Sequence, residues 1–152
     1  MDILRAIAEI RTPVFDAFFS LITRMGEEIF FLAVAIIFFW CVNKREGYFV
    51  LITGLFGTVL NQGAKLLFRI PRPWVYDPTF EVVGDAKVAA TGYSFPSGHT
   101  QNVAGTLGSI AAYKSTKKKI IVCTVLILLV AFSRMYLGVH TLLDVVVSLV
   151  FA

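Results

Sequence analysis

Long apolar stretches, separated by short polar turns, occupy most of the chain. Three of them carry almost no charge over lengths that approach one membrane crossing, which takes about 20 residues. They are residues 29–42, residues 47–64 with helix continuing to Phe68, and residues 120–132. The pattern predicts three firm membrane-spanning helices, the second of which ends before Pro71-Arg72-Pro73.

Three further segments carry weaker helical patterns. Residues 1–28 combine an amphipathic helix suited to the membrane surface with a short or tilted first span. Residues 99–113 place Ala104 and Gly108 four apart, a spacing that lets helices approach closely. Residues 138–152 would rise only about 22 Å at 1.5 Å per residue, short of a hydrocarbon core of roughly 30 Å. We therefore expect the last helix to be truncated or unusually short.

Composition supports a membrane protein. Hydrophobic residues make up 57% of the 152 residues and charged residues only 16%, and the mean hydropathy is +0.78. The predicted fold class is all-α: one domain, residues 1–152, forming a polytopic transmembrane bundle of about six helices. A net charge of +4, dispersed among apolar runs, does not suit a nucleic-acid surface. Nothing in the sequence specifies an oligomeric state.

The short loops predict how the protein is oriented in the membrane. Residues 43–46 and 114–119 are the short loops richest in Lys and Arg, and such loops favour the cytoplasmic side. The long loop 69–98, rich in turn-forming residues, and the connection 133–139 then fall on the opposite side. We expect an integral, multi-pass membrane protein whose polar clusters face the extracytoplasmic side.

Three clusters of polar residues stand at the ends of spans on that side. They are Lys65 with Arg72, Ser97-Gly98-His99, and Arg134 with His140 and Asp144. Two cations about two helical turns apart can clamp an anion, and the free N–H groups at a helix start also favour one. His140 and Asp144, four residues apart, can pair on one helical face. Taken singly, each cluster also fits snorkelling cations, a helix cap or a structural histidine.

Together the clusters offer three cations, two imidazoles and a helix start with a single carboxylate. This inventory suits a phosphate. It also predicts chemistry with no metal and no cofactor, because a metal phosphohydrolase needs several clustered ligands. Asp77, Glu81 and Asp85 show no such ligand spacing. The sequence also lacks the motifs of serine hydrolases, P-loop nucleotidases and Cys-x-x-Cys zinc sites.

The three clusters, read in order, resemble the tripartite motif of the type 2 phosphatidic acid phosphatase superfamily. The matching patterns are Lys65-x6-Arg72-Pro73, Pro96-Ser97-Gly98-His99, and Ser133-Arg134-x5-His140-x3-Asp144. The resemblance extends over the spans from about Ile29 onward. It implies a six-helix bundle with a core like that of the haloperoxidases, although the apolar spans argue against the soluble haloperoxidases themselves.

The resemblance also implies roles for individual residues. His140 would attack phosphorus and form a phosphohistidine, Asp144 would orient His140, and His99 would protonate the leaving oxygen. The phosphoryl oxygens would be held by Lys65, Arg72, Ser97, Gly98 and Arg134.

The implied activity is metal-independent hydrolysis of a lipid phosphate or diphosphate within the bilayer. Polyprenyl diphosphate, phosphatidic acid and phosphatidylglycerol phosphate are the candidate substrates. Two alternatives remain open at this point: a phosphotransferase that uses the same site, and a non-catalytic membrane protein that binds phospholipid.

Overall fold

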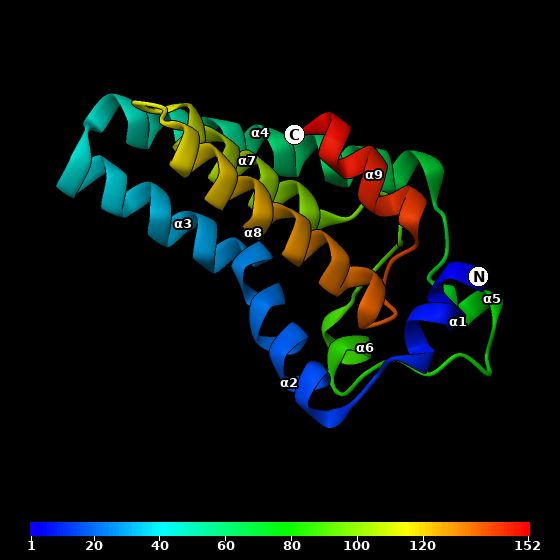
Figure 1. Cartoon of the computed structure of the whole chain (residues 1–152). Helices are drawn as coiled ribbons and strands as arrows, with labels where there is room; N and C mark the ends of the chain where they lie inside the picture. The colour runs from blue at the N-terminus through cyan, green and yellow to red at the C-terminus, as the bar shows by residue number, and fades with distance from the viewer.

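The computed structural model describes residues 1–152 and is entirely helical apart from its turns and loops (Figure 1). The α-helices are α1 (Asp2–Glu9), α2 (Pro13–Ile22), α3 (Glu28–Ile37), α4 (Lys44–Phe68), α5 (Pro73–Tyr76), α6 (Ala86–Ala89), α7 (Gly98–Ala112), α8 (Lys117–Tyr136) and α9 (Leu142–Phe151). A 3-10 turn, η1 (Thr23–Gly26), follows α2, and a π-helical turn, η2 (Phe38–Val42), follows α3. The predicted all-α fold class is confirmed.

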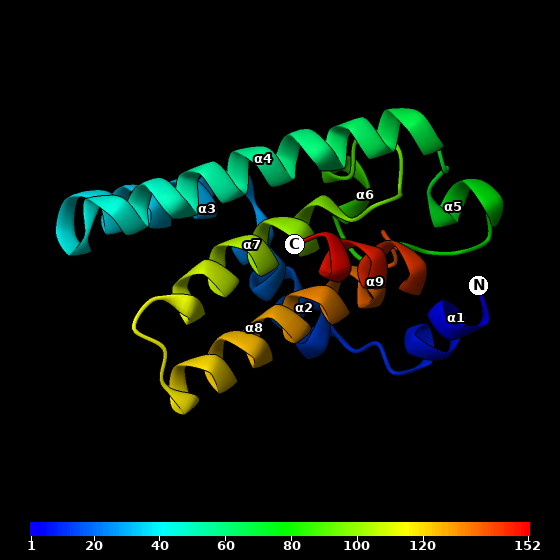
Figure 2. The same cartoon turned by 90° about the horizontal axis from the view of Figure 1, so that it is seen from above.

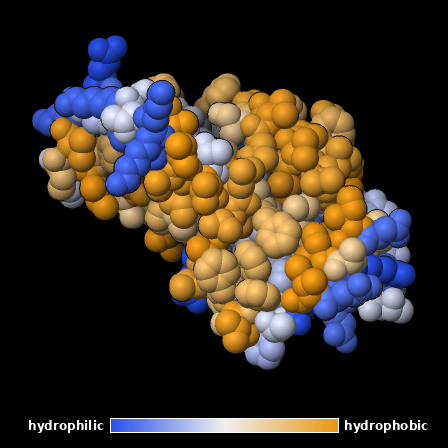
Figure 3. All heavy atoms as spheres, viewed as in Figure 1, coloured by the Kyte–Doolittle hydropathy of each residue, from blue (hydrophilic) through white to orange (hydrophobic).

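The longer helices run side by side along one axis, with α7 between α4 and α8 (Figures 1 and 2). Hydrophilic side chains gather at the two ends of this bundle, and apolar side chains cover the middle (Figure 3). Many large apolar residues of that belt are exposed, for example Phe56 at 63% and Leu67 at 76%. Such a belt is what a helix bundle presents to lipid.

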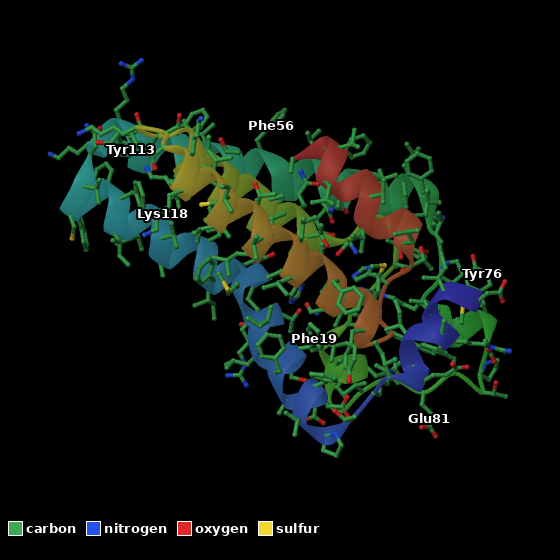
Figure 4. All side chains as sticks on the ribbon, viewed as in Figure 1. Phe19, Phe56, Tyr76, Glu81, Tyr113 and Lys118 are labelled. Carbon is green, nitrogen blue, oxygen red and sulfur yellow. The ribbon has the colours of Figure 1, made fainter.

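The two ends of the bundle differ in the elements that form them. Tyr113 and Lys118 lie at one end, and Tyr76 and Glu81 lie at the other (Figure 4). We call the first the lysine end, since the turns 43–46 and 114–119 form it, and the second the loop end, since α1 and the connection 69–97 form it. The two lysine-rich turns share one end, as expected.

The predicted first and second spans form a single bent pair. Pro13–Gly26 and Glu28–Val42 pass the length and hydropathy requirements of a span together, with a bend of 55° between them. The break falls at Gly26 and at Glu27, whose backbone is extended (ψ 152°). Two adjacent carboxylates, Glu27 and Glu28, are costly in hydrocarbon, so the helix opens there to a polar pocket. The predicted count of six helices is therefore only approximate.

The other spans follow the predicted pattern. Lys44–Tyr76 and Lys117–Tyr136 are each long and apolar enough to cross a bilayer. Helix α4 continues past Lys65 to Phe68 and ends at Arg69, which adopts the left-handed conformation (φ 49°). Helix α7 is buried over most of its length and lies in the bundle interior, in agreement with the spacing of small residues that allows close approach of helices. Helix α9 has only 10 residues.

The N-terminal helix α1 packs at the loop end. Leu4 is buried, whereas Ile3 and Ile10 are exposed. Arg5 Nη2 lies 2.6 Å from Asp77 Oδ2, and the hydrogen bond that Arg5 donates holds the pKa of Asp77 below its usual value. The segment 1–11 is thereby attached to the connection that leads into the candidate site.

Candidate active site

A cavity of about 580 Å³ opens between the break in the first span, the end of α4, the connection 89–93 and the start of α7. Six of the predicted site residues line it: Lys65, Arg72, Gly98, His99, Arg134 and His140. Ser97 and Asp144 lie behind the cavity wall and are completely or almost completely buried. The structure thus brings together clusters that are separated by up to 79 positions in sequence, from Lys65 to Asp144.

His140 lies in the connection between α8 and α9 and is 2% exposed. Gly138, with φ +82°, reverses the chain after α8, a conformation that glycine adopts without strain. The turn is held by hydrogen bonds from the His140 amide to Arg134 O (3.3 Å) and from Arg72 Nη1 to Val139 O (3.0 Å). The loop that carries the histidine is therefore held by the Arg72 guanidinium and by the backbone carbonyl of Arg134.

The neighbours of the His140 ring define its tautomer. Arg72 Nη1 lies 3.0 Å from Nε2, and because a guanidinium can only donate, Nε2 must be the acceptor. Nδ1 then carries the proton and faces Asp144 Oδ2 at 3.4 Å. A ring that accepts from a guanidinium at Nε2 and carries its proton at Nδ1 is neutral. The result is a neutral imidazole whose Nε2 lone pair faces the cavity wall and accepts a hydrogen bond from Arg72.

Asp144 contacts His140 through a geometry that differs from the predicted one. We expected both residues on one helical face, but α9 begins at Leu142, so His140 precedes the helix. Asp144 instead closes a capping box: its Oδ2 accepts from the Thr141 amide (2.8 Å), and its own amide donates to Thr141 Oγ1 (3.3 Å). The helix start therefore sets the position of the carboxylate against the imidazole.

Sequence reasoning missed two partners of Asp144. Ser94 is fully buried and its hydroxyl donates to Asp144 Oδ2 at 2.5 Å. Thr141 is the other partner, and the Thr-x-x-Asp spacing of a capping box was readable in the sequence. No local pattern marks Ser94, because its contact joins positions 50 apart.

The cations are held by acceptors from the connection before α7. Lys65 Nζ donates to Tyr93 O (2.8 Å), and Arg72 donates to Gly92 O (3.1 Å) and Thr91 O (2.8 Å). Helix α4 ends at Phe68, as predicted, so Lys65 and Arg72 converge through the turn at Arg69 and not along one helical face.

Arg134 is held differently from the other two cations. Its Nη1 donates to Thr23 Oγ1 at 2.7 Å, and its Nε has no hydrogen-bond partner. Thr23 belongs to the break in the first span, a segment that carries none of the three motifs.

The start of α7 presents His99 and Gly98 to the cavity. Ser97 is the N-cap: its Oγ accepts from the Thr100 amide (3.4 Å) and the Thr100 hydroxyl (3.0 Å). The Ser97 side chain therefore lies in the helix cap, while the helix N-terminus itself faces the cavity.

The arrangement is suited chemically to a tetrahedral anion. Three cations and a helix start can neutralise its oxygens, and two imidazoles can carry out nucleophilic and proton-transfer steps. No cluster of three or more His, Cys, Asp or Glu side chains has a geometry that could hold a metal ion.

Comparison with known proteins shows the family of this chain. Residues 45–152 match the family model of the PAP2 superfamily. The chain belongs to the PAP2 superfamily. Phosphatidylglycerophosphatase B of Bacillus subtilis is 30% identical over 94% of this chain and 72% of its own length. A dihydrosphingosine 1-phosphate phosphatase of Schizosaccharomyces pombe is 30% identical over 89% of this chain, which spans only 35% of that relative.

Two solved structures share the fold of this PAP2 chain. The transmembrane PAP2-type phosphatidylglycerolphosphate phosphatase from Bacillus subtilis superposes with a TM-score of 0.83, 28% identity, and coverage of 99% of this chain and 79% of the other. LpxE from Aquifex aeolicus gives a TM-score of 0.87 at 23% identity, covering 99% of this chain and 87% of the other. The predicted family, phosphatase class and integral membrane character are confirmed.

Proposed function

We propose that this PAP2 protein hydrolyses a membrane lipid phosphate or diphosphate without a metal, through a phosphohistidine on His140. The observation that carries the proposal is the His140 ring: its Nδ1–H faces Asp144, and its Nε2 faces Arg72 at the cavity wall. Phosphatidic acid, phosphatidylglycerol phosphate and polyprenyl diphosphate are the candidate substrates. The names of the related phosphatases support a lipid phosphate as the substrate class.

In the first step, Arg72 Nη1 transfers its hydrogen bond from His140 Nε2 to a phosphoryl oxygen, which frees the Nε2 lone pair. That lone pair attacks phosphorus and a P–N bond forms. The bond to the lipid oxygen breaks, and protonated His99 gives its proton to that oxygen. Asp144 stabilises the positive charge that develops on His140. Lys65, Arg72 and Arg134, with the amide groups at Gly98, bind the equatorial oxygens, where phosphoryl transfer needs neutralised charge.

In the second step, water replaces the lipid alcohol. His99, now neutral, accepts a proton from water as the water oxygen attacks phosphorus. The P–N bond breaks, His140 recovers its lone pair, and inorganic phosphate leaves. A lipid diphosphate follows the same path with the lipid monophosphate as the leaving group.

We also propose that the protein crosses the membrane several times with the cavity open to the extracytoplasmic side. The lysine-rich turns at the opposite end of the bundle support this orientation. Impermeant thiol labelling of single cysteines at positions 44 and 87, in a Cys41→Ala, Cys123→Ala background, tests it. Only position 87 should react from outside, and labelling of position 44 from outside would reverse the orientation.

Trapping the phosphoenzyme tests the mechanism. Labelled lipid phosphate should yield acid-labile, base-stable phosphate on wild-type protein and none on His140→Ala. His99→Ala should accumulate the phosphoenzyme when the substrate has a good leaving group. Phosphate release should continue in EDTA and stop with vanadate, which can adopt the five-coordinate geometry of the reaction. Trapped phosphate on another residue, or activity lost in EDTA and restored by Mg²⁺, would refute the mechanism.

A further inference from the structure

We propose that the break in the first span is a fourth component of the active site, in which Thr23 positions Arg134 and Gly26 seats His99. Thr23 and Gly26 lie outside residues 45–152, which match the family model. The inference rests on the proposed function, because it assigns Arg134 and His99 to phosphate binding and proton transfer.

Arg134 depends on Thr23 to an unusual degree. Arg134 is only 5% exposed, and Thr23 Oγ1 is the only acceptor of a hydrogen bond from its side chain in the protein. A buried guanidinium with so few partners is costly, unless an anion completes its hydrogen bonds. Because Thr23 binds Nη1, the remaining N–H groups of Arg134, including the unpartnered Nε–H, can donate to an anion in the cavity that Arg134 lines.

Arg72 provides the contrast. Three backbone carbonyls, of Thr91, Gly92 and Val139, accept from its guanidinium, so no single side chain determines its orientation. Arg134 has one acceptor, and that acceptor is a side-chain hydroxyl. A single substitution at Thr23 can therefore release Arg134, whereas no comparable substitution exists for Arg72.

Gly26 connects the same break to His99. A Cβ atom added at Gly26 would lie 2.7 Å from both the Cβ and the backbone O of His99. The Gly26 carbonyl also accepts from Asn102 Nδ2 at 3.3 Å. The break thus packs directly on the first turn of α7, and a larger residue would displace the backbone of His99.

The break has its own structural reason to lie at this depth. Glu27 and Glu28 follow Gly26 and line the same cavity, where their carboxylates have no ion-pair partner. Their charge keeps this part of the span out of hydrocarbon, and the short turn η1 then places Thr23 against α8. The opening of the span and the support of Arg134 are consequences of the same local sequence.

Substitution of Thr23 with Val tests the inference, because valine keeps the shape and removes the hydroxyl. We expect kcat/KM for a lipid phosphate to fall about tenfold or more, in line with the loss of one charge-assisted hydrogen bond. Thr23→Ser should restore most of the activity. The matched control is Thr106→Val, since Thr106 is buried in α7 and its hydroxyl has no partner. It should stay near wild-type activity.

A double-mutant cycle separates positioning from general destabilisation. In an Arg134→Ala background, Thr23→Val should cause no further loss, because the interaction it removes is already absent. Additive losses in the two variants would overturn the inference. Equal activity of Thr23→Val and wild type would also overturn it, while leaving the proposed function intact.

Vanadate binding gives a readout that does not depend on turnover. Vanadate should raise the melting temperature of the wild type, and the rise should be clearly smaller for Thr23→Val. If the wild type released no phosphate from any lipid yet showed this difference, the proposed hydrolysis would fail and the positioning of Arg134 would stand. Equal vanadate shifts in both proteins would refute the role of Thr23.

Discussion

Cations at the two ends of the bundle have the same chemistry and opposite environments. At the lysine end, Lys44, Arg45, Lys117 and Lys118 are exposed. Toward the loop end, Lys65, Arg72 and Arg134 are 9%, 6% and 5% exposed. Water solvates the first group, so its charges can orient the protein without organising any structure. The buried group needs protein acceptors, and their number and type differ from one cation to the next.

This comparison shows how burial converts a charge into a binding group. Carbonyl groups from residues 91–93 hold Lys65 and Arg72 at one side of the cavity. A hydroxyl, that of Thr23, holds Arg134. None of the three cations has a carboxylate within ion-pair distance. Glu27 and Glu28 line the same cavity but pair with none of the three cations, so the cationic N–H groups can still donate to an anion there.

The largest expected difference between the two ends is the response to removal of charge. Arg72→Ala should lower kcat/KM by roughly 10²- to 10³-fold, because it removes a donor to the transferring phosphoryl group. Lys117→Ala should leave kcat/KM unchanged. Phosphate release from phosphatidic acid in detergent micelles measures both. Comparable losses in the two variants would show that burial does not separate the two groups.

A smaller effect is expected when the buried charge is kept and its shape is changed. Arg72→Lys retains the cation but loses the fork that reaches Thr91 O and Gly92 O together. We expect about a tenfold loss in kcat/KM, since lysine cannot replace a guanidinium at a site with several acceptors. Arg45→Lys at the lysine end should have no effect. Wild-type activity of Arg72→Lys would mean that charge alone suffices.

The comparison extends to hydroxyl groups that donate to carboxylates. Ser94 donates to buried Asp144, and Thr79 donates to Asp77 near the surface. Ser94→Ala should lower the free energy of unfolding by about 1 kcal/mol and reduce kcat several-fold, because a buried carboxylate loses a donor. Thr79→Val is the matched control and should change neither quantity. Chemical denaturation and phosphate release measure the pair, and equal effects would contradict the distinction.

The smallest expected effect concerns the surface pair Arg5–Asp77. The pKa of Asp77 is lowered in the folded protein, so its stabilising contribution is present above the pKa of the unfolded chain and is lost as pH falls through the folded value. Arg5→Ala should lower the melting temperature slightly near neutral pH and not at all well below about pH 4. A difference that grows toward acid would have the wrong sign.

The sequence predicted the residues that meet in the cavity better than it predicted the residues that hold them in position. Lys65, His99 and His140 stand in short patterns that need no knowledge of the fold. Ser94 and Thr23 act through contacts between distant positions, 50 and 111 residues apart, so no local spacing records them. The carbonyl groups of residues 91–93 are backbone atoms, which carry no residue signature at all.

For the fold, too, the sequence predicted some features and not others. Hydropathy identified the long spans α4 and α8, because lipid imposes the same apolar requirement along their whole length. Hydropathy also separated the first span, within residues 1–28, from residues 29–42, but it did not reveal that the two form one bent segment. That relation depends on packing of the break against α7 and α8. Packing of this kind is a property of the assembled bundle.

The capping box at α9 has a consequence for how this protein can change in evolution. One carboxylate, Asp144, both starts the helix and faces the imidazole of His140. An insertion or deletion between Thr141 and Asp144 would shift the helix start and separate the pair in a single event. Substitution of Asp144 is therefore constrained by folding and by chemistry together, because any replacement changes both the start of α9 and the contact with His140.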